Sequence, residues 1–175
     1  AGLPDIAAAL RSARGVKGRV EVVPVPAAYT VIIDYAHTPD ALENILTTVR
    51  DLTDRRVICL FGCGGDRDRS KRPVMGSIAA ALADICVVTS DNPRTEEPVA
   101  IIADILKGME GTDTPVRVEP DRRAAIRLAL SEAGTGDVVV LAGKGHETYQ
   151  EINGVQFHLD EREEVAGFFA RGRRG

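Results

Sequence analysis

Short, continuously apolar runs that alternate with amphipathic segments limit the fold of this chain more than any other feature. Such runs occur at residues 30–33, 56–61, 85–89 and 138–141. Strands that are apolar throughout are typical of a parallel sheet, because helices cover both of its faces. The segments between the runs show helical spacing of apolar residues. The chain is therefore predicted to be a Rossmann-like α/β domain with a mostly parallel sheet and helices on both faces.

Capping and turn residues place the helices and one hairpin. Thr38, which precedes Pro39, and Asp121 are predicted to cap two helices. Asn153-Gly154 predicts the turn of a hairpin that would add an antiparallel edge to the sheet. Further helices are expected over residues 3–13, 74–83, 99–109 and 160–169, and further strands over 18–22 and 116–118. The short connections favour a single domain after residue 29.

Charge and cysteine content exclude several classes of function. The 175 residues carry a formal charge of −4 without an internal basic cluster, so no nucleic-acid partner is expected. No apolar run reaches the ~18 residues that a bilayer requires, so no membrane partner is expected either. Three cysteines, two of them within apolar runs, are typical of a reducing compartment, and we expect a cytoplasmic protein. Cys59 and Cys63 lack a second pair at zinc-ligand spacing, and no metal site is predicted.

The most informative loop is Asp91-Asn92-Pro93-Arg94, which follows an apolar run. Pro93 fixes its own φ and disfavours the helical region for Asn92, so this turn is stiff. Open α/β sheets bind ligands at the carboxyl ends of their strands, and the planar guanidinium of Arg94 suits a carboxylate or phosphate. A plainer interpretation is a strand-to-helix turn with Thr95 as the helix N-cap.

Polar side chains gather at the predicted carboxyl ends of four strands. The four groups are Asp34 with His37, Arg67 with its glycines, Asp91 to Arg94, and Gly143 to Glu147. Arg67 and Arg94 suit carboxylates, and Glu147 suits an ammonium group. Gly143 lets backbone amides approach a ligand closely. Together these residues predict a pocket for a zwitterion with more than one carboxylate.

Other interpretations of these motifs remain open. Gly62-Cys63-Gly64-Gly65 is a partial dinucleotide-binding fingerprint with Arg67 in place of the third glycine. Gly143-Lys144-Gly145-His146 lacks the earlier glycine and the following Ser or Thr of a phosphate loop, so no triphosphate cradle is predicted. His37 and His146 are expected to form hydrogen bonds, because no third metal ligand is clear. A solvated charged loop is expected for Asp68, Arg69, Lys71 and Arg72.

Five motifs follow one another over most of the chain. They are Gly18-Arg19-Val20-Glu21, Asp34-Tyr35-Ala36-His37-Thr38-Pro39, Gly62-Cys63-Gly64-Gly65-Asp66-Arg67-Asp68 with Lys71-Arg72-Pro73, Asp91-Asn92-Pro93-Arg94 and Gly143-Lys144-Gly145-His146-Glu147. This series resembles the C-terminal domain of the UDP-N-acetylmuramoyl-tripeptide synthetases, which are Mur ligases of peptidoglycan synthesis. The resemblance implies ATP-dependent addition of a diamino acid to UDP-MurNAc-L-Ala-D-Glu through an acyl phosphate. The Asp-Asn-Pro-Arg form is similar to that of enzymes adding meso-diaminopimelate rather than L-lysine.

The resemblance also implies roles for individual residues. The diaminopimelate site would consist of Arg67, Asp91, Asn92, Arg94, Gly143 and Glu147. The two arginines of this set would hold the carboxylates of the amino acid. Arg19 and Asp34 would contact the adenosine part of ATP, with His37 nearby. No catalytic residue is expected in this chain.

The family pattern includes parts that have no counterpart in this sequence. These are the N-terminal UDP-binding domain and the central ATPase domain with its Mg²⁺ ligands. Residues 1–17 would be the tail of the central domain, and residues 18–175 the C-terminal domain. ATP and Mg²⁺ are the expected cofactors, and the expected partners are meso-diaminopimelate, ATP and UDP-MurNAc-L-Ala-D-Glu, the last through the other domains. The chain alone is not expected to catalyse ligation.

Three alternatives remain. The first is the L-lysine-adding homologue. The second comprises the folylpolyglutamate synthases and other Mur ligases, which share this architecture but not the Asp-Asn-Pro-Arg and Gly-Lys-Gly-His-Glu pair. The third is a stand-alone module that binds an amino acid or a dinucleotide.

Overall fold

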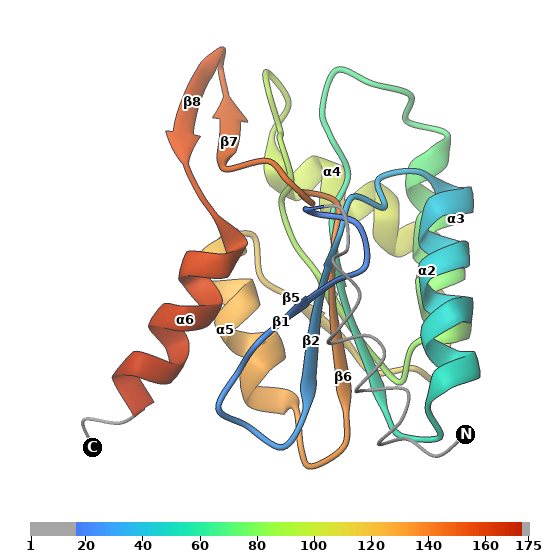
Figure 1. Cartoon of the computed structure of the whole chain (residues 1–175). Helices are drawn as coiled ribbons and strands as arrows, with labels where there is room; N and C mark the ends of the chain where they lie inside the picture. Colours follow the sequence, from blue (N-terminus) through green and yellow to red (C-terminus); the bar gives the residue numbers. More distant parts are fainter. Residues whose placement is uncertain (1–16, 173–175) are drawn as a thin grey trace.

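A computed structural model describes residues 17–172, which form a six-stranded sheet with helices on both faces (Figure 1). The strand order is β1-β2-β6-β3-β4-β5. Only β1 is antiparallel to its neighbour, so the predicted fold class, a mostly parallel α/β sheet, is confirmed. The strands are β1 (Glu21–Val23), β2 (Thr30–Asp34), β3 (Val57–Phe61), β4 (Ile85–Val88), β5 (Val116–Val118) and β6 (Val138–Ala142). The helix expected over residues 3–13 lies outside the described residues.

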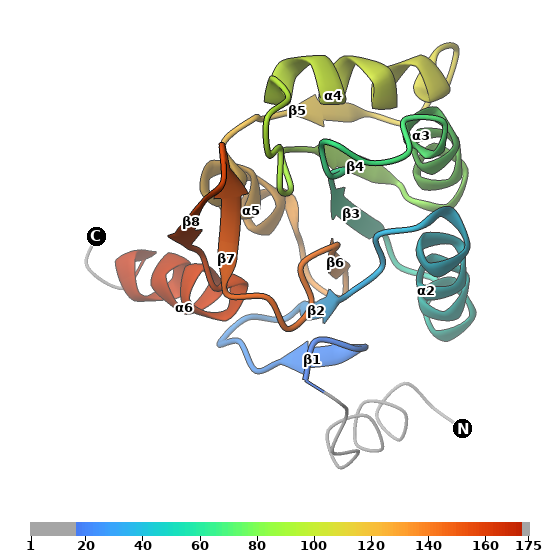
Figure 2. The same cartoon turned by 90° about the horizontal axis from the view of Figure 1, so that it is seen from above.

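The helices form one layer on each side of the sheet, as the view from above shows (Figure 2). One layer contains α2 (Pro39–Leu52), α3 (Lys71–Leu82), α4 (Pro98–Leu106) and the short 3₁₀ helix η1 (Lys107–Met109). The other contains α5 (Arg122–Glu132) and α6 (Glu161–Gly172). Within residues 17–172, none of the helices combines the length and the apolarity needed to cross a bilayer.

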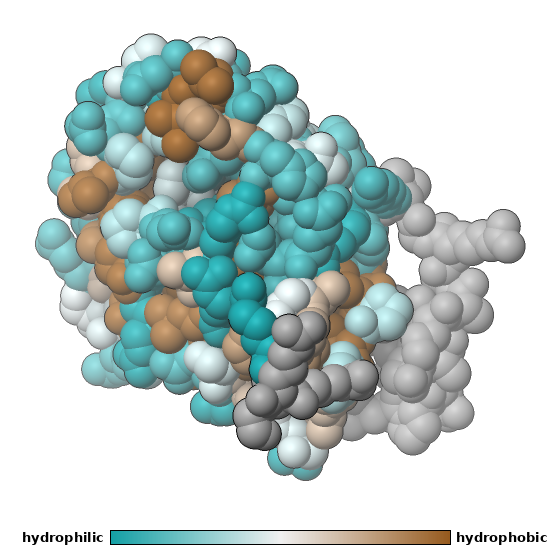
Figure 3. All heavy atoms as spheres, turned by 90° about the vertical axis from the view of Figure 1, so that its left-hand side faces the viewer, coloured by the Kyte–Doolittle hydropathy of each residue, from teal (hydrophilic) through white to brown (hydrophobic). Residues whose placement is uncertain are grey.

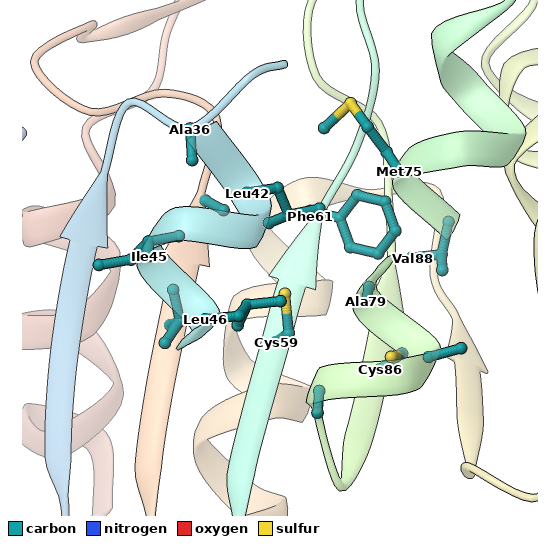
Figure 4. Packing of buried hydrophobic residues seen from close by; sticks show 14 of the residues in the cluster. Ala36, Leu42, Ile45, Leu46, Cys59, Phe61, Met75, Ala79, Cys86 and Val88 are labelled. Carbon is teal, nitrogen blue, oxygen red and sulfur yellow. The ribbon is translucent and has the colours of Figure 1, made fainter. Parts of the chain in front are cut away.

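Alternate residues of each central strand point to opposite helix layers. Cys59 and Phe61 of β3 pack with Met75 beneath α2 and α3 (Figure 4). Ile58 and Leu60 of the same strand belong to the cluster on the α5 side. Because both sets of side chains are buried, β3 is apolar at every position, as predicted for a strand covered on both faces.

The predicted caps are confirmed for two helices and wrong for a third. Thr38 Oγ1 accepts a hydrogen bond from Ala41 N at the start of α2, and Asp121 caps α5 in the same way. The N-cap of α4 is Glu97 rather than Thr95. The Thr95 hydroxyl donates instead to Asp66 Oδ1, over 2.7 Å. A carboxylate from a distant loop therefore competes successfully for this hydroxyl group.

The predicted hairpin forms from β7 (Tyr149–Ile152) and β8 (Val155–His158), but it is a separate sheet and not an edge of the main one. The antiparallel edge of the main sheet is β1. The hairpin stands above the carboxyl ends of the strands (Figure 1), where Arg94 N donates to Glu151 O and Asn153 N donates to Arg94 O. These bonds attach β7 to the loop after β4. Apolar surface gathers near the top of the molecule (Figure 3), and the exposed hairpin residues include Val155 and Phe157.

Candidate functional site

The carboxyl ends of β2, β3, β4 and β6 meet around a cavity of about 340 Å³. The cavity is lined by all six residues predicted for the amino-acid site, Arg67, Asp91, Asn92, Arg94, Gly143 and Glu147, and by His37. They meet because β6, which is the last strand of the main sheet in the sequence, lies between β2 and β3. Ligands of open α/β sheets bind at such points of changed strand order. The structure therefore brings the six residues together, and their role in binding stays a prediction.

Arg94 is a fixed cation on the wall of the cavity. Its backbone has a positive φ of 52°, and the hairpin holds this backbone through two hydrogen bonds, one to Glu151 of β7 and one from Asn153 in the turn. Its Nη1 donates to Gly65 O over 2.8 Å, and its Nε lies 3.2 Å from Glu151 Oε2. The other guanidinium hydrogens remain for two parallel bonds to a carboxylate. Arg67 donates from Nη1 to Asp66 O and provides a second, more exposed cation.

Behind the part of the wall formed by Asp91, Asn92 and Glu147 lies a lysine that the sequence analysis missed. Lys144 is fully buried, and its Nζ donates to Asn92 Oδ1. The same ammonium lies 3.0 Å from Asp91 Oδ1 and 3.3 Å from Glu147 Oε2. Burial alone would raise the pKa of Asp91, but the charges of Lys144 and Arg122 outweigh this effect and lower the pKa. A lysine between two glycines directly after a buried strand was the available signal.

A second buried pair ties the helix layer to the strand ends below the cavity. Arg122, also fully buried, donates to Ser90 O over 3.1 Å and to Ala142 O over 2.9 Å. Its partner is Glu161, with Nη2 and Oε1 2.8 Å apart. Burial raises the pKa of Glu161, although Arg122 acts in the opposite direction. Sequence reasoning missed both residues, because a charge in an amphipathic helix is usually exposed.

The prediction of a solvated charged loop is wrong for Arg72. Its side chain is fully buried and pairs with Glu96 at 2.8 Å and with Asp104 at 3.0 Å. Nη2 also donates to Gly64 O, so Arg72 fixes the glycine loop beside the loop that carries Arg94. The other residues of this loop fit the prediction better, since Asp68 and Arg69 are exposed and Lys71 is half-buried. Lys71 donates a hydrogen bond to His37 O.

Of the three residues predicted to lie at the nucleotide, Arg19 and Asp34 lie beside the cavity, whereas His37 lines it. Asp34 is buried at the end of β2, and its Oδ2 accepts a hydrogen bond of 2.7 Å from Val20 N. Arg19 precedes Val20 and is exposed, and neither Arg19 nor Asp34 lines the cavity. The two regions are joined because Gly143 N donates to Asp34 O. Asp34 and Arg19 therefore lie on adjoining segments, as a shared role requires.

Glycine is required where the first turn of the described chain crosses the loop after β6. A Cβ atom on Gly18, which has a φ of +76°, would lie 2.1 Å from His146 N. The imidazole rings of His37 and His146 both pack near the ring of Tyr35, with centroid distances of 4.5 and 4.9 Å. His37 Nδ1 lies 2.8 Å from Tyr35 O. Within residues 17–172, no group of three or more His, Cys, Asp or Glu side chains is placed to hold a metal ion.

A mostly parallel sheet with arginines and carboxylates around a cavity at its carboxyl edge defines the class of protein, an open α/β domain. The family described as Mur ligase, glutamate ligase domain, matches residues 18–145. The chain belongs to this family. The resemblance seen in the five sequence motifs is thereby confirmed.

Curated proteins of known name are more than half identical to this chain over most of its length. A UDP-N-acetylmuramoyl-L-alanyl-D-glutamate–2,6-diaminopimelate ligase of Syntrophomonas wolfei is 55% identical over 96% of this chain and 34% of its own length. The ligase of the same name from Clostridioides difficile is 53% identical over 88% of this chain and 32% of its own length. The chain thus spans about a third of the length of the curated relatives that it matches.

Solved structures agree with the fold. A structure of a UDP-N-acetylmuramoyl-L-alanyl-D-glutamate–2,6-diaminopimelate ligase is 43% identical, with a TM-score of 0.85, over 92% of this chain and 33% of that one. FolC of E. coli in complex with ADP has a TM-score of 0.59 at 19% identity, over 91% of this chain and 33% of that one. This second likeness shows the fold alone.

Proposed function

We propose that this chain is the C-terminal domain of an ATP-dependent ligase of peptidoglycan synthesis in the cytoplasm. The whole enzyme would add meso-diaminopimelate to UDP-MurNAc-L-Ala-D-Glu through an acyl phosphate. The observation that carries the proposal is the single cavity that collects all six predicted amino-acid-binding residues. The names of the relatives at 53% and 55% identity support the same substrate. Residues 18–175 would form this domain, and residues 1–17 would end the domain before it.

The cavity would receive the distal end of meso-diaminopimelate, which carries an ammonium and a carboxylate. Arg94 would hold the carboxylate through its remaining guanidinium hydrogens, with Arg67 as a second cation. Asp91 and Glu147 supply the negative charge for the ammonium group. L-lysine lacks the distal carboxylate and would leave the remaining guanidinium hydrogens of Arg94 without an acceptor. Such a loss weakens binding by roughly tenfold to a hundredfold.

The turn around Arg19 and the end of β2 would form the edge that meets ATP. Asp34 uses Oδ2 for Val20 N, and its second oxygen suits a ribose hydroxyl group. Arg19 is exposed beside it and suits a phosphate or the adenosine ring. ATP would supply the phosphoryl group that activates the acceptor carboxylate. Mg²⁺ ligands are expected in the other domains of the longer enzyme, where the phosphates would lie.

Amide-proton NMR titrations of the chain with meso-diaminopimelate and with L-lysine test the proposal. We expect meso-diaminopimelate to shift the amide signals of Arg67, Asp91 to Arg94 and Gly143 to Glu147, and L-lysine to shift them only at much higher concentration. The Arg94→Ala variant should lose the response. Equal responses to both amino acids, or shifts confined to other parts of the chain, would contradict the proposed substrate.

A further inference from the structure

Lys144 has an unusual place for a lysine, because it touches three members of the cavity wall without lining the cavity itself. Its Nζ contacts Asn92, Asp91 and Glu147. On another side it lies 5.6 Å from the ring centroid of Tyr149. A fully buried ammonium group is costly to desolvate unless several acceptors surround it. All three acceptors belong to residues that line the cavity.

Lys144 helps to fix which atom of Asn92 a ligand meets. Lys144 Nζ and Glu151 N both donate to the same Asn92 atom, which must therefore be the carbonyl oxygen Oδ1. The amide nitrogen Nδ2 then points the other way and donates to Glu147 Oε2 over 3.0 Å. Its second hydrogen is left for a ligand. Asn92 is consequently a donor toward the cavity, which suits a carboxylate and opposes an ammonium group.

Lys144 also balances the charge of the wall. The side chains that line the cavity comprise three cations, Arg67, Lys71 and Arg94, and three carboxylates, Asp68, Asp91 and Glu147. Behind them, Lys144 and Glu151 add one charge of each sign. The site as a whole is thus formally neutral and matches a neutral zwitterionic group. Without Lys144 it would carry a net negative charge and would favour a bare ammonium group.

We propose that Lys144 is a positioning residue that makes the cavity select a ligand end with both an ammonium and a carboxylate over an end with an ammonium alone. The inference rests on the proposed function, because it assumes that the distal end of an amino acid enters the cavity. Lys144 acts through Asp91, Asn92 and Glu147 and does not touch the ligand. Its role is therefore measured by the ratio of two affinities rather than by one affinity.

The test compares meso-diaminopimelate and L-lysine binding to the wild-type chain and to Lys144→Met, by NMR titration and calorimetry. We expect the preference for meso-diaminopimelate to fall by about tenfold or more, because its affinity drops while that of L-lysine is kept or increased. The side-chain amide signals of Asn92 should also move in the free variant. Lys107→Met is the matched control, since Lys107 is exposed and pairs with Asp104 away from the cavity.

Lys144→Gln separates charge from hydrogen bonding, because glutamine can still donate to Asn92 but carries no charge. We expect Lys144→Gln to lose the preference as Lys144→Met does, and its weaker disturbance of buried packing covers the case in which the methionine variant fails to fold. If either folded variant keeps the wild-type preference for meso-diaminopimelate, the role of Lys144 is overturned and the proposed function stands. A wild-type chain that binds neither amino acid would instead overturn the proposed function, and this inference with it.

Discussion

Gly143 lines the cavity with a backbone conformation that favours glycine. Its φ of +118° is unfavourable for any L side chain, and a Cβ atom there would lie 3.4 Å from Asp91 Oδ2. We expect Gly143→Ala to lower the free energy of unfolding by about 1–2 kcal/mol. We also expect it to weaken meso-diaminopimelate binding, because the added methyl group would lie against Asp91 in the wall of the cavity. Urea unfolding and NMR titration measure the two effects.

Gly154→Ala is the matched control for this substitution. Gly154 also has a positive φ, of 77°, but a Cβ atom there would meet nothing within 4 Å. The control should therefore lose a similar amount of stability through backbone strain and keep its affinity. If both variants bind meso-diaminopimelate as the wild type does, Gly143 does not shape the binding site.

Single residues were predictable from the sequence where their chemistry is visible without a partner. Arg94 and Gly143 belong to this group, because a guanidinium suits anions and a glycine permits close approach wherever the fold places them. Lys144 and Arg72 do not. Their burial depends on carboxylates from segments far away in the sequence, and a lysine or arginine among polar neighbours is usually exposed.

At the scale of elements, the Arg122–Glu161 pair connects α5 and α6 with the ends of β4 and β6. Arg122→Met would leave Glu161 buried without its ion-pair partner and two carbonyl groups without their donor. We expect a loss of about 3–5 kcal/mol in the free energy of unfolding, measured in urea. Amide hydrogen exchange should increase most around Ser90 and Ala142.

The neighbouring Arg123 provides the comparison. Arg123 pairs with Glu164, but 39% of its side chain is exposed. Arg123→Met should therefore cost less than about 1 kcal/mol. Equal losses in the two variants would show that the buried pair has no special role in holding the helices to the strand ends.

The order and type of the elements followed from the sequence, but the site of the hairpin did not. Asn153-Gly154 indicates the turn from local chemistry alone, and both residues have positive φ values. Whether β7 joins the main sheet depends on which backbone groups it meets. The loop around Arg94 offers an N–H to β7 and a carbonyl group to the turn that follows it, and no local pattern in residues 149–158 contains this information.

For the molecule as a whole, the ionised carboxylates of the Arg72 cluster predict how stability depends on pH. Hydrogen bonds from Arg72 lower the pKa of Glu96 below its ordinary value of 4.5. The unfolded chain therefore binds the proton more tightly than the folded protein does. The contribution of Glu96 to stability is complete above about pH 4.5 and is lost as the pH falls through the lower pKa of the folded state.

The Glu96→Gln variant isolates this contribution, because glutamine does not titrate. At pH 7 we expect it to be less stable than the wild type by about 1–3 kcal/mol, since Arg72 is buried and loses a charged partner. The gap should shrink steadily below about pH 4.5, as protonated Glu96 comes to resemble glutamine. Glu97→Gln, an exposed neighbour whose side chain makes no capping hydrogen bond, should show no comparable gap. Urea unfolding of the three proteins between pH 7 and about pH 3 measures the gap. A gap that stays constant over this range would mean that Glu96 stabilises the fold through packing or uncharged hydrogen bonds rather than through its charge.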